Sequence, residues 1–235
     1  MALIAMAVHS TVENDRLKYT KQSIKSLLET VDLSKHRVFV VNDASSEETH
    51  KFLTGVKGIH YYKFDENVGT ARAINHVIEK RQPSEVVIKA DDDVVWHLKG
   101  WVDKMCDAIK ARPDIGILGL KRDDIQGTFV KDGLFDFGDD IMGTCTAFNP
   151  LLLDKIGYMK QFSTYGFDDV LMSARSIGAG FKNAYLPYIK IDHIDDGKNA
   201  YCEWKRQEAH KYLLECGELC TLIKKGEIGY YYGFN

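Results

Sequence analysis

Three consecutive aspartates, Asp91, Asp92 and Asp93, directly follow the apolar run VVIKA at 86–90. A β-branched run of this kind indicates a buried strand, so the carboxylates lie at the end of a core element. In an extended segment Asp91 and Asp93 would project to one side and Asp92 to the other. Two neighbouring carboxylates both stay ionised only beside a cation, so we interpret the triplet as a site for a hard divalent ion, Mg²⁺ or Mn²⁺. The alternative is a solvated acidic loop.

Polar residues also follow two other predicted strands. His9 and Ser10 come after the apolar run 2–8, and Asp43 comes after the β-branched run 37–41. In open α/β sheets, ligands bind beyond the carboxyl ends of the strands. We therefore expect these side chains and the aspartate triplet to line one ligand site.

The first half of the chain alternates between strand and helix patterns, which predicts an α/β fold with a mostly parallel central sheet flanked by helices. The predicted strands are 2–8, 37–41, 59–64, 85–90 and 115–120, and the predicted helices between them lie within 15–31, 45–55, 67–81 and 101–114. These elements place each polar cluster at a strand end.

The second half of the chain is less regular. Residues 121–142 are rich in Gly and Asp and predict a loop or a short hairpin, and 143–149 resembles a further strand. The pair Asp168-Asp169 opens a predicted helix, and 200–225 is predicted to be a long C-terminal helix that precedes an aromatic tail. We expect one domain with a terminal extension.

Composition limits the function classes. The chain has 235 residues, 45% of them hydrophobic, and a net charge of −3, so no basic excess points to nucleic acid. No apolar run is long enough to cross a bilayer, and the N-terminus lacks a signal-peptide pattern, so we expect a cytoplasmic location. The five cysteines are scattered and are expected to be reduced; a zinc site with Cys216, Cys220 and His210 is disfavoured.

Five stretches together resemble nucleotide-sugar glycosyltransferases of the GT-A fold, in their order and spacing. They are VVNDASSEE, NVGTARAINHVIEK, VVIKADDDVVW, YGFDDVLMSARSIGAGFK and IDHI. The resemblance is greatest to the large inverting family that includes cellulose, chitin and lipopolysaccharide glycosyltransferases, and it covers about residues 1–195. It implies a GT-A domain over 1–198, with a nucleotide-binding half (1–120) and an acceptor or catalytic half (121–198). Residues 199–235 would form a helical extension packed on that domain.

The resemblance also implies roles for individual residues. Asp43 would accept a hydrogen bond from the nucleotide base, normally uracil, and Asp91 would face the ribose or base. Asp93 would hold the metal that bridges both phosphates, and His193 would complete its coordination. The residues assigned to the nucleotide sugar are His9, Ser10, Asp43, Asn67, Gly69, Arg72, Asn75, Lys89, Asp91 and Asp92.

Asp169 matches the catalytic base of that family, and Asp168 matches the acid that commonly precedes it. Transfer from a nucleotide diphosphate needs a cation to neutralise the leaving group and a carboxylate to take the proton of the attacking hydroxyl. The start of a helix favours the ionised form of Asp169. The expected activity is therefore metal-dependent, inverting transfer from a UDP-sugar.

The sequence departs from the family pattern in three places. The usual DDGS after the second strand is NDAS, with Asn42 and Ala44, and the acid before the base is Asp rather than the more frequent Glu. The Gln-x-x-Arg-Trp motif of processive members is missing, and EWKRQ (203–207) is not equivalent to it. We therefore expect single additions rather than chain extension.

Three alternatives stay open at this point. DDDVV also fits the Asp-x-Asp-x-Val motif of haloacid-dehalogenase-like phosphotransferases, but that motif ends the first strand of their core. A nucleotidyltransferase would need a Gly-rich, Arg-containing first loop, which AVHSTVEND lacks. A non-catalytic nucleotide-sugar binding module would not need Asp169.

The acceptor and the oligomeric state are open. A saccharide or another small hydroxyl compound is favoured as acceptor, and a hydroxylated DNA base is less favoured because the overall charge gives it no support. Lys205 and Arg206 are interpreted as a solvated helix face, although they could reach a diphosphate. Tyr230, Tyr231 and Tyr232 are interpreted as packing the tail onto the core.

Overall fold

The computed structural model describes residues 1–195, 197 and 200–230. Its centre is a nine-stranded sheet in the order β3-β2-β1-β4-β9-β6-β10-β8-β7, and β5 pairs with β11 in a separate two-stranded sheet. The strands are β1 (Ala2–Val8), β2 (Arg37–Asp43), β3 (His60–Phe64), β4 (Val86–Ala90), β5 (Val94–Trp96), β6 (Ile115–Leu120), β7 (Val130–Asp132), β8 (Phe135–Phe137), β9 (Cys145–Phe148), β10 (Lys182–Leu186) and β11 (Ile191–His193).

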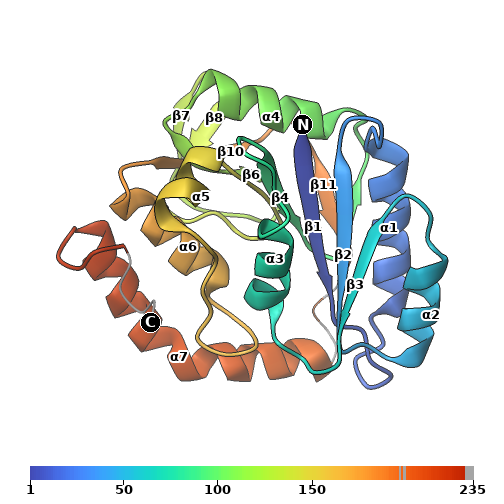
Figure 1. Ribbon diagram of the computed structural model, residues 1–235. Helices are drawn as coiled ribbons and strands as arrows, with labels where there is room; N and C mark the ends of the chain where they lie inside the picture. The colour runs from blue at the N-terminus through green and yellow to red at the C-terminus, as the bar shows by residue number, and fades with distance from the viewer. Residues whose placement is uncertain (196, 198–199, 231–235) are drawn as a thin grey trace.

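Helices cover both faces of the sheet (Figure 1). They are α1 (Leu17–Thr30), α2 (Glu47–Gly55), α3 (Thr70–Ile78), α4 (Trp101–Ala111), α5 (Pro150–Ile156), α6 (Asp168–Gly178) and α7 (Ala200–Lys224). The predicted α/β class is confirmed, and so are the five strands predicted for the first half. The predicted hairpin in 121–142 is the antiparallel pair β7–β8.

One strand changes the expected topology. β1, β2, β3 and β4 pair in parallel, but β9 lies between β4 and β6 and is antiparallel to both. The two predicted halves of the domain therefore share one continuous sheet. As a consequence, the turn before β9, at Gly143 and Thr144, comes beside the carboxyl end of β4, where Thr144 accepts a hydrogen bond from the Asp91 amide at 2.9 Å.

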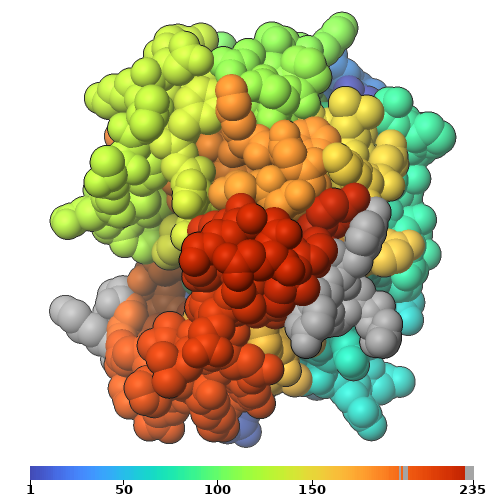
Figure 2. Space-filling view, turned by 90° about the vertical axis from the view of Figure 1, so that its left-hand side faces the viewer, coloured from blue at the N-terminus to red at the C-terminus, as the bar shows by residue number. Residues whose placement is uncertain are grey.

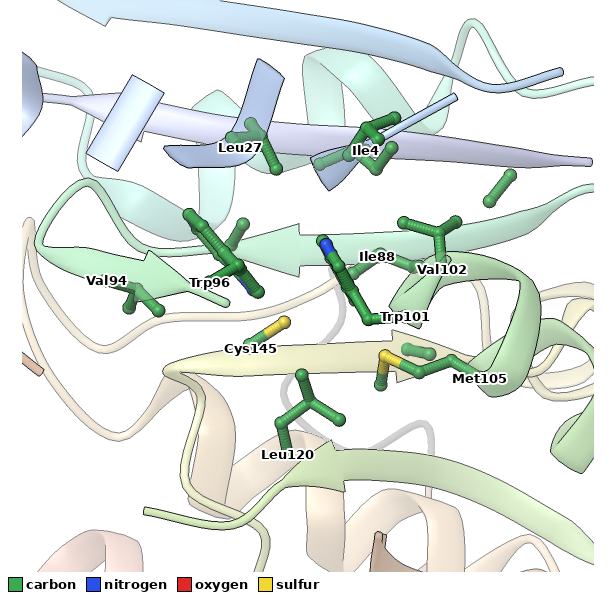
Figure 3. Packing of buried hydrophobic residues seen from close by; sticks show 14 of the residues in the cluster. Ile4, Leu27, Ile88, Val94, Trp96, Trp101, Val102, Met105, Leu120 and Cys145 are labelled. Carbon is green, nitrogen blue, oxygen red and sulfur yellow. The ribbon is translucent and has the colours of Figure 1, made fainter. Parts of the chain in front are cut away.

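Alternation along β1 divides the core between the two faces of the sheet. Ile4 and Met6 pack with α1 and α4 on one face, whereas Leu3 and Ala5 pack with α3 and α5 on the other. Figure 3 shows the first cluster, in which the rings of Trp96 and Trp101 stack with centroids 5.5 Å apart. This rigid packing fixes β4 and β5 on either side of the aspartate triplet.

The C-terminal helix packs against α6. Leu171 and Ala174 of α6 form a small buried cluster with Cys216, Cys220 and Ile223 of α7. Tyr230 packs at the edge of this cluster, whereas Tyr231 and Tyr232 lie outside the described residues. Among the described helices, none combines the length and the apolar character needed to span a membrane.

Candidate active site

A cavity of about 300 Å³ opens at the carboxyl ends of β1, β2 and β4, and the start of α6 and the N-terminal part of α7 complete its wall. Nine residues assigned from the sequence line it: His9, Asp43, Lys89, Asp91, Asp92, Asp93, Asp168, Asp169 and His193. Side chains that are up to 184 residues apart in the sequence thus meet at one edge of the sheet, as expected for this class of sheet.

The other five assigned residues do not line this cavity. Ser10 is buried, and the Asn67 amide nitrogen lies 3.4 Å from Nε2 of His9, which is part of the cavity wall. Arg72 is exposed on α3. Asn75 bonds both the amide and the carbonyl of Met159, which makes it an anchor for that loop. Gly69 is described below with Asp43.

The aspartate triplet forms a turn rather than the extended segment that we expected. Asp92 is therefore not directed away from the other two acids; it is buried, and it accepts hydrogen bonds from Arg16 at 2.9 Å and from Thr20 at 2.7 Å. Both of its oxygens are engaged by protein groups. The geometry shows that Asp92 anchors the loop, and its assignment to the nucleotide sugar stays a prediction.

Arg16 organises this acidic loop, and sequence reasoning missed it. Its guanidinium donates to Asp92, to Asp93 at 2.7 Å and to Asp195 at 2.5 Å, and only 4% of the residue is exposed. The ring of Tyr201, from the start of α7, lies 5.1 Å from the guanidinium carbon. The network thereby joins the start of α1, the acidic loop, the segment after β11 and the C-terminal helix.

Asp93 and His193 lie close together. His193 Nε2 lies 3.4 Å from Asp93 Oδ2, because β11 pairs antiparallel with β5 and brings His193 opposite Val94. Burial opposes ionisation of Asp93, but the hydrogen bond from His193 and the charge of Arg16 lower its pKa overall. Asp93 is therefore held as a carboxylate.

The donor set fits a divalent cation that also binds a ligand. Asp93 Oδ1 is buried and accepts no hydrogen bond from any described residue, so one oxygen is available to a cation. Among the described residues, no three His, Cys, Asp or Glu side chains converge into a complete metal site. Asp93 and His193 would thus supply part of a coordination shell, and the remaining positions would suit phosphate oxygens and water.

Asp43 holds the loop that leads into α3. Its two carboxylate oxygens accept the amides of Val68 at 2.8 Å and Gly69 at 2.9 Å. Burial raises the pKa of Asp43, and these two hydrogen bonds oppose the shift. Gly69 has φ of +85° and a Cβ there would come 2.6 Å from the carbonyl oxygen of Thr164, so this close approach requires glycine.

Lys89 lies near Asp168 and Asp169, the two acids at the start of α6. Its buried ammonium donates to Asp91 at 2.5 Å and to the carbonyl of Gly143 at 2.6 Å. Burial works against its charge, but Asp91 and Asp168 raise the pKa of Lys89. Lys89 is thus a fixed counter-charge for Asp91 rather than an open contact for a nucleotide.

Asp168 and Asp169 occupy different positions, although they are adjacent. Asp169 is fixed by backbone amides, with Oδ2 accepting from Gly143 at 3.0 Å and Oδ1 from Val170 at 2.8 Å. Asp168 faces the cavity above Lys89. Burial raises the pKa of Asp168 to about 6; Lys89 opposes this shift, whereas Asp169 and Asp91 add to it.

This raised pKa predicts a pH-dependent effect of Asp168→Asn on stability. Below the ordinary pKa of 3.8 the Asp168 carboxyl is protonated in both the folded and the unfolded chain, so its raised pKa does not lower the free energy of unfolding there. Between 3.8 and about 6 the folded state binds more protons, so stability falls as the pH rises, and above about 6 the cost is complete. Asp168→Asn removes that cost, so its gain in the free energy of unfolding should be larger at about pH 8 than at about pH 4. Urea unfolding at both values measures it, and an equal gain at both would contradict the assignment.

Other wall residues were missed or misjudged. Lys205 is not on a purely solvated face: it lines the cavity, and its ammonium lies 5.0 Å from the centre of the Tyr201 ring and 5.5 Å from that of Tyr165. Arg122 also lines the cavity. The sequence signal for Lys205 is the aromatic and basic composition of 200–206, which does not by itself distinguish a pocket wall from a helix surface.

Comparison with known proteins identifies the class. The family model described as Glycosyl transferase family 2 matches residues 11–189, so the chain belongs to this family and is a glycosyltransferase that uses a nucleotide-sugar donor. Family membership removes the phosphotransferase and nucleotidyltransferase alternatives. A search of curated protein sequences found no significant match.

Solved structures of two glycosyltransferases share the GT-A fold with this chain. Mannosyltransferase PcManGT from Pyrobaculum calidifontis, in complex with GDP-Man and Mn²⁺, has a TM-score of 0.71 at 15% identity, over 99% of this chain and 70% of that one. S. aureus TarS 1–349 in complex with UDP has a TM-score of 0.60 at 15% identity, over 81% of this chain and 59% of that one. At this identity the likeness concerns the fold.

Proposed function

We propose that this glycosyltransferase is metal-dependent and inverting, and that it moves single sugars from a UDP-sugar to a hydroxyl acceptor. The observation that carries the proposal is the buried Oδ1 of Asp93, which has no hydrogen-bond partner among the described residues. The other oxygen of this carboxylate lies 3.4 Å from His193 Nε2, and both residues line the cavity that also holds Asp43 and Asp169. A divalent cation bound there would neutralise the departing diphosphate.

The surrounding residues supply the other requirements. Arg16 keeps Asp93 ionised and oriented, and Lys205 places a positive charge on the cavity wall where an anionic ligand would bind. Asp43 and the backbone that it fixes at Val68 and Gly69 form the end of the cavity at β2, where we place the uracil base. Arg72 and Asn75 are not needed in this scheme.

Asp169 is our candidate for the base. It belongs to the wall of the donor cavity and also to the wall of a second cavity on the other side, so its carboxylate lies between a donor and an acceptor. The two backbone amides that bond it fix its orientation. A carboxylate so placed can accept the proton of an acceptor hydroxyl during attack.

The relatives of known structure leave the donor base open, since PcManGT was solved with GDP-Man and TarS with UDP or UDP-GlcNAc. A panel of UDP- and GDP-sugars should therefore be tested for hydrolysis with and without Mn²⁺. We expect hydrolysis of a UDP-sugar that depends on the metal. Preference for a GDP-sugar would correct the base assignment only, whereas no binding or hydrolysis of any nucleotide sugar would reject the proposed function.

A further inference from the structure

A second cavity of about 1100 Å³ adjoins the donor cavity, and Asp169 and Met142 belong to the walls of both. The segment 121–142, α6 and β10 enclose it. Figure 2 shows this face of the molecule, with the yellow-green 121–142 region beside the orange residues of α6 and β10 and next to the red end of α7. Since Asp169 connects the two spaces, the larger one is where an acceptor would approach.

Aromatic rings form one part of the wall. Phe129, Phe137 and Phe181 are half-buried there, and Tyr185 lies behind Phe129 in an edge-to-face contact with ring centroids 5.7 Å apart. Half-buried rings offer flat apolar faces that can cover the C–H face of a sugar ring or another apolar surface. The rings alone do not distinguish these ligands.

Polar groups on the same wall distinguish between a sugar and a purely apolar ligand. Asn183 is 2% exposed, and its amide nitrogen donates to the carbonyls of Asp139 at 2.8 Å and Ser173 at 3.0 Å. This fixes the orientation of the amide and leaves Oδ1 with no hydrogen-bond donor among the described residues. Gln126 and Thr128 add further polar groups at the mouth. A ligand rich in hydroxyl groups matches this lining better than a hydrocarbon does.

The charge of the wall favours a neutral acceptor over an anionic one. Five aspartates line the cavity, against one lysine, Lys182. Three cations outside the wall pair with four of these aspartates: Arg112 with one, Arg122 with one and Lys224 with two. The aspartates are Asp124, Asp132, Asp139, Asp140 and Asp169. Carboxylates accept hydrogen bonds from neutral hydroxyl groups and repel phosphates, including those of DNA.

We infer that this cavity binds a neutral saccharide as the acceptor, an inference that rests on the proposed function of the donor site. In the reaction, the acceptor oxygen bonds to the anomeric carbon of the donor while the bond from that carbon to the diphosphate oxygen breaks. The electron pair of the broken bond leaves with the diphosphate, and the hydroxyl proton passes to Asp169. Phosphorylated sugars and hydroxylated bases in DNA are poor acceptors for this site.

The test compares neutral and anionic probes on the full chain with UDP and Mn²⁺ present. Methyl hexosides, the corresponding hexose phosphates and a DNA duplex that carries hydroxymethylated pyrimidines are compared by saturation-transfer NMR and titration. We expect a neutral hexoside to bind at least about tenfold more tightly than its phosphate. Phe129→Leu should weaken hexoside binding about tenfold, whereas Leu134→Ser, in the same hairpin but outside the cavity wall, should not.

Four results would contradict a neutral saccharide as the acceptor. Tighter binding of a hexose phosphate or of the duplex, no binding of any neutral hexoside, or equal binding by wild type and Phe129→Leu would overturn it. Calorimetric binding of UDP with Mn²⁺ is measured separately on the same preparation. If UDP binds and the saccharides do not, the acceptor inference alone fails; if UDP does not bind either, the proposed function fails as well.

Discussion

Asp169→Asn is expected to lower the rate of sugar transfer by about 10²- to 10⁴-fold while UDP binding is retained. The amide has the same shape and can keep the hydrogen bond from Gly143, but it cannot take a proton from the acceptor. Steady-state transfer to a hydroxyl acceptor gives the rate, and calorimetry with UDP gives the binding constant. Loss of kcat with little change in nucleotide affinity is the signature of a residue that acts in the transition state.

Asp168→Asn is the matched control, because it removes an adjacent carboxylate of the same cavity. Asp168 lines the donor cavity but not the larger cavity, so it is not placed between donor and acceptor. We expect a smaller loss of transfer than for Asp169→Asn. If the Asp169→Asn enzyme keeps its rate and the Asp168→Asn enzyme loses it, the two roles are reversed.

Arg16→Met is expected to reduce the free energy of unfolding by about 3–5 kcal/mol. The substitution keeps much of the side-chain volume but leaves Asp92, Asp93 and Asp195 buried without the guanidinium that bonds all three. Breaking a buried ionic network on one side leaves uncompensated charge, which costs far more than losing an exposed pair. Urea unfolding at neutral pH measures the difference.

Lys18→Met is the control for this prediction. Lys18 pairs with Asp15 in the same segment, but both side chains are more than half exposed, so the expected loss is at most about 1 kcal/mol. A similar small loss for Arg16→Met would mean that the acidic loop does not depend on Arg16. It would also remove the reason for assigning Arg16 to the orientation of Asp93.

Much of the fold was predictable because its first half is local. Each β-branched run and each amphipathic run between Ala2 and Leu120 reports its own secondary structure, and parallel strands with helical connections follow from their alternation. The insertion of β9 between β4 and β6 was not predictable, because it depends on pairing with β6 across 27 to 31 residues and with β4 across 55 to 61 residues. The small β5–β11 sheet was missed for a further reason: its strands have only three residues each, and such short strands carry little periodic signal.

The candidate site was also predictable only in part. The aspartate triplet and Asp43 were found from their positions after strands, and His193 and Asp169 came from the family resemblance. Arg16 was missed because nothing in the sequence near DRLKYT distinguishes a buried arginine from a surface one. The extended geometry assumed for the triplet was wrong, because the tight turn at Asp92 is held by tertiary bonds to Arg16 and Thr20.

Calorimetric titration of Mn²⁺ into the wild-type chain and the Asp93→Asn variant, each saturated with UDP, tests the central claim most directly. The variant keeps Arg16 bonded to Asp92 and Asp195, so the fold of the loop should persist. We expect Mn²⁺ to bind the wild-type complex and to bind the variant at least about tenfold more weakly. The amide carries no negative charge, and because its oxygen must accept from Arg16, its NH₂ group takes the position of the unpartnered Oδ1. Equal Mn²⁺ affinity of the two proteins, or no Mn²⁺ uptake by the wild-type complex, would contradict the account.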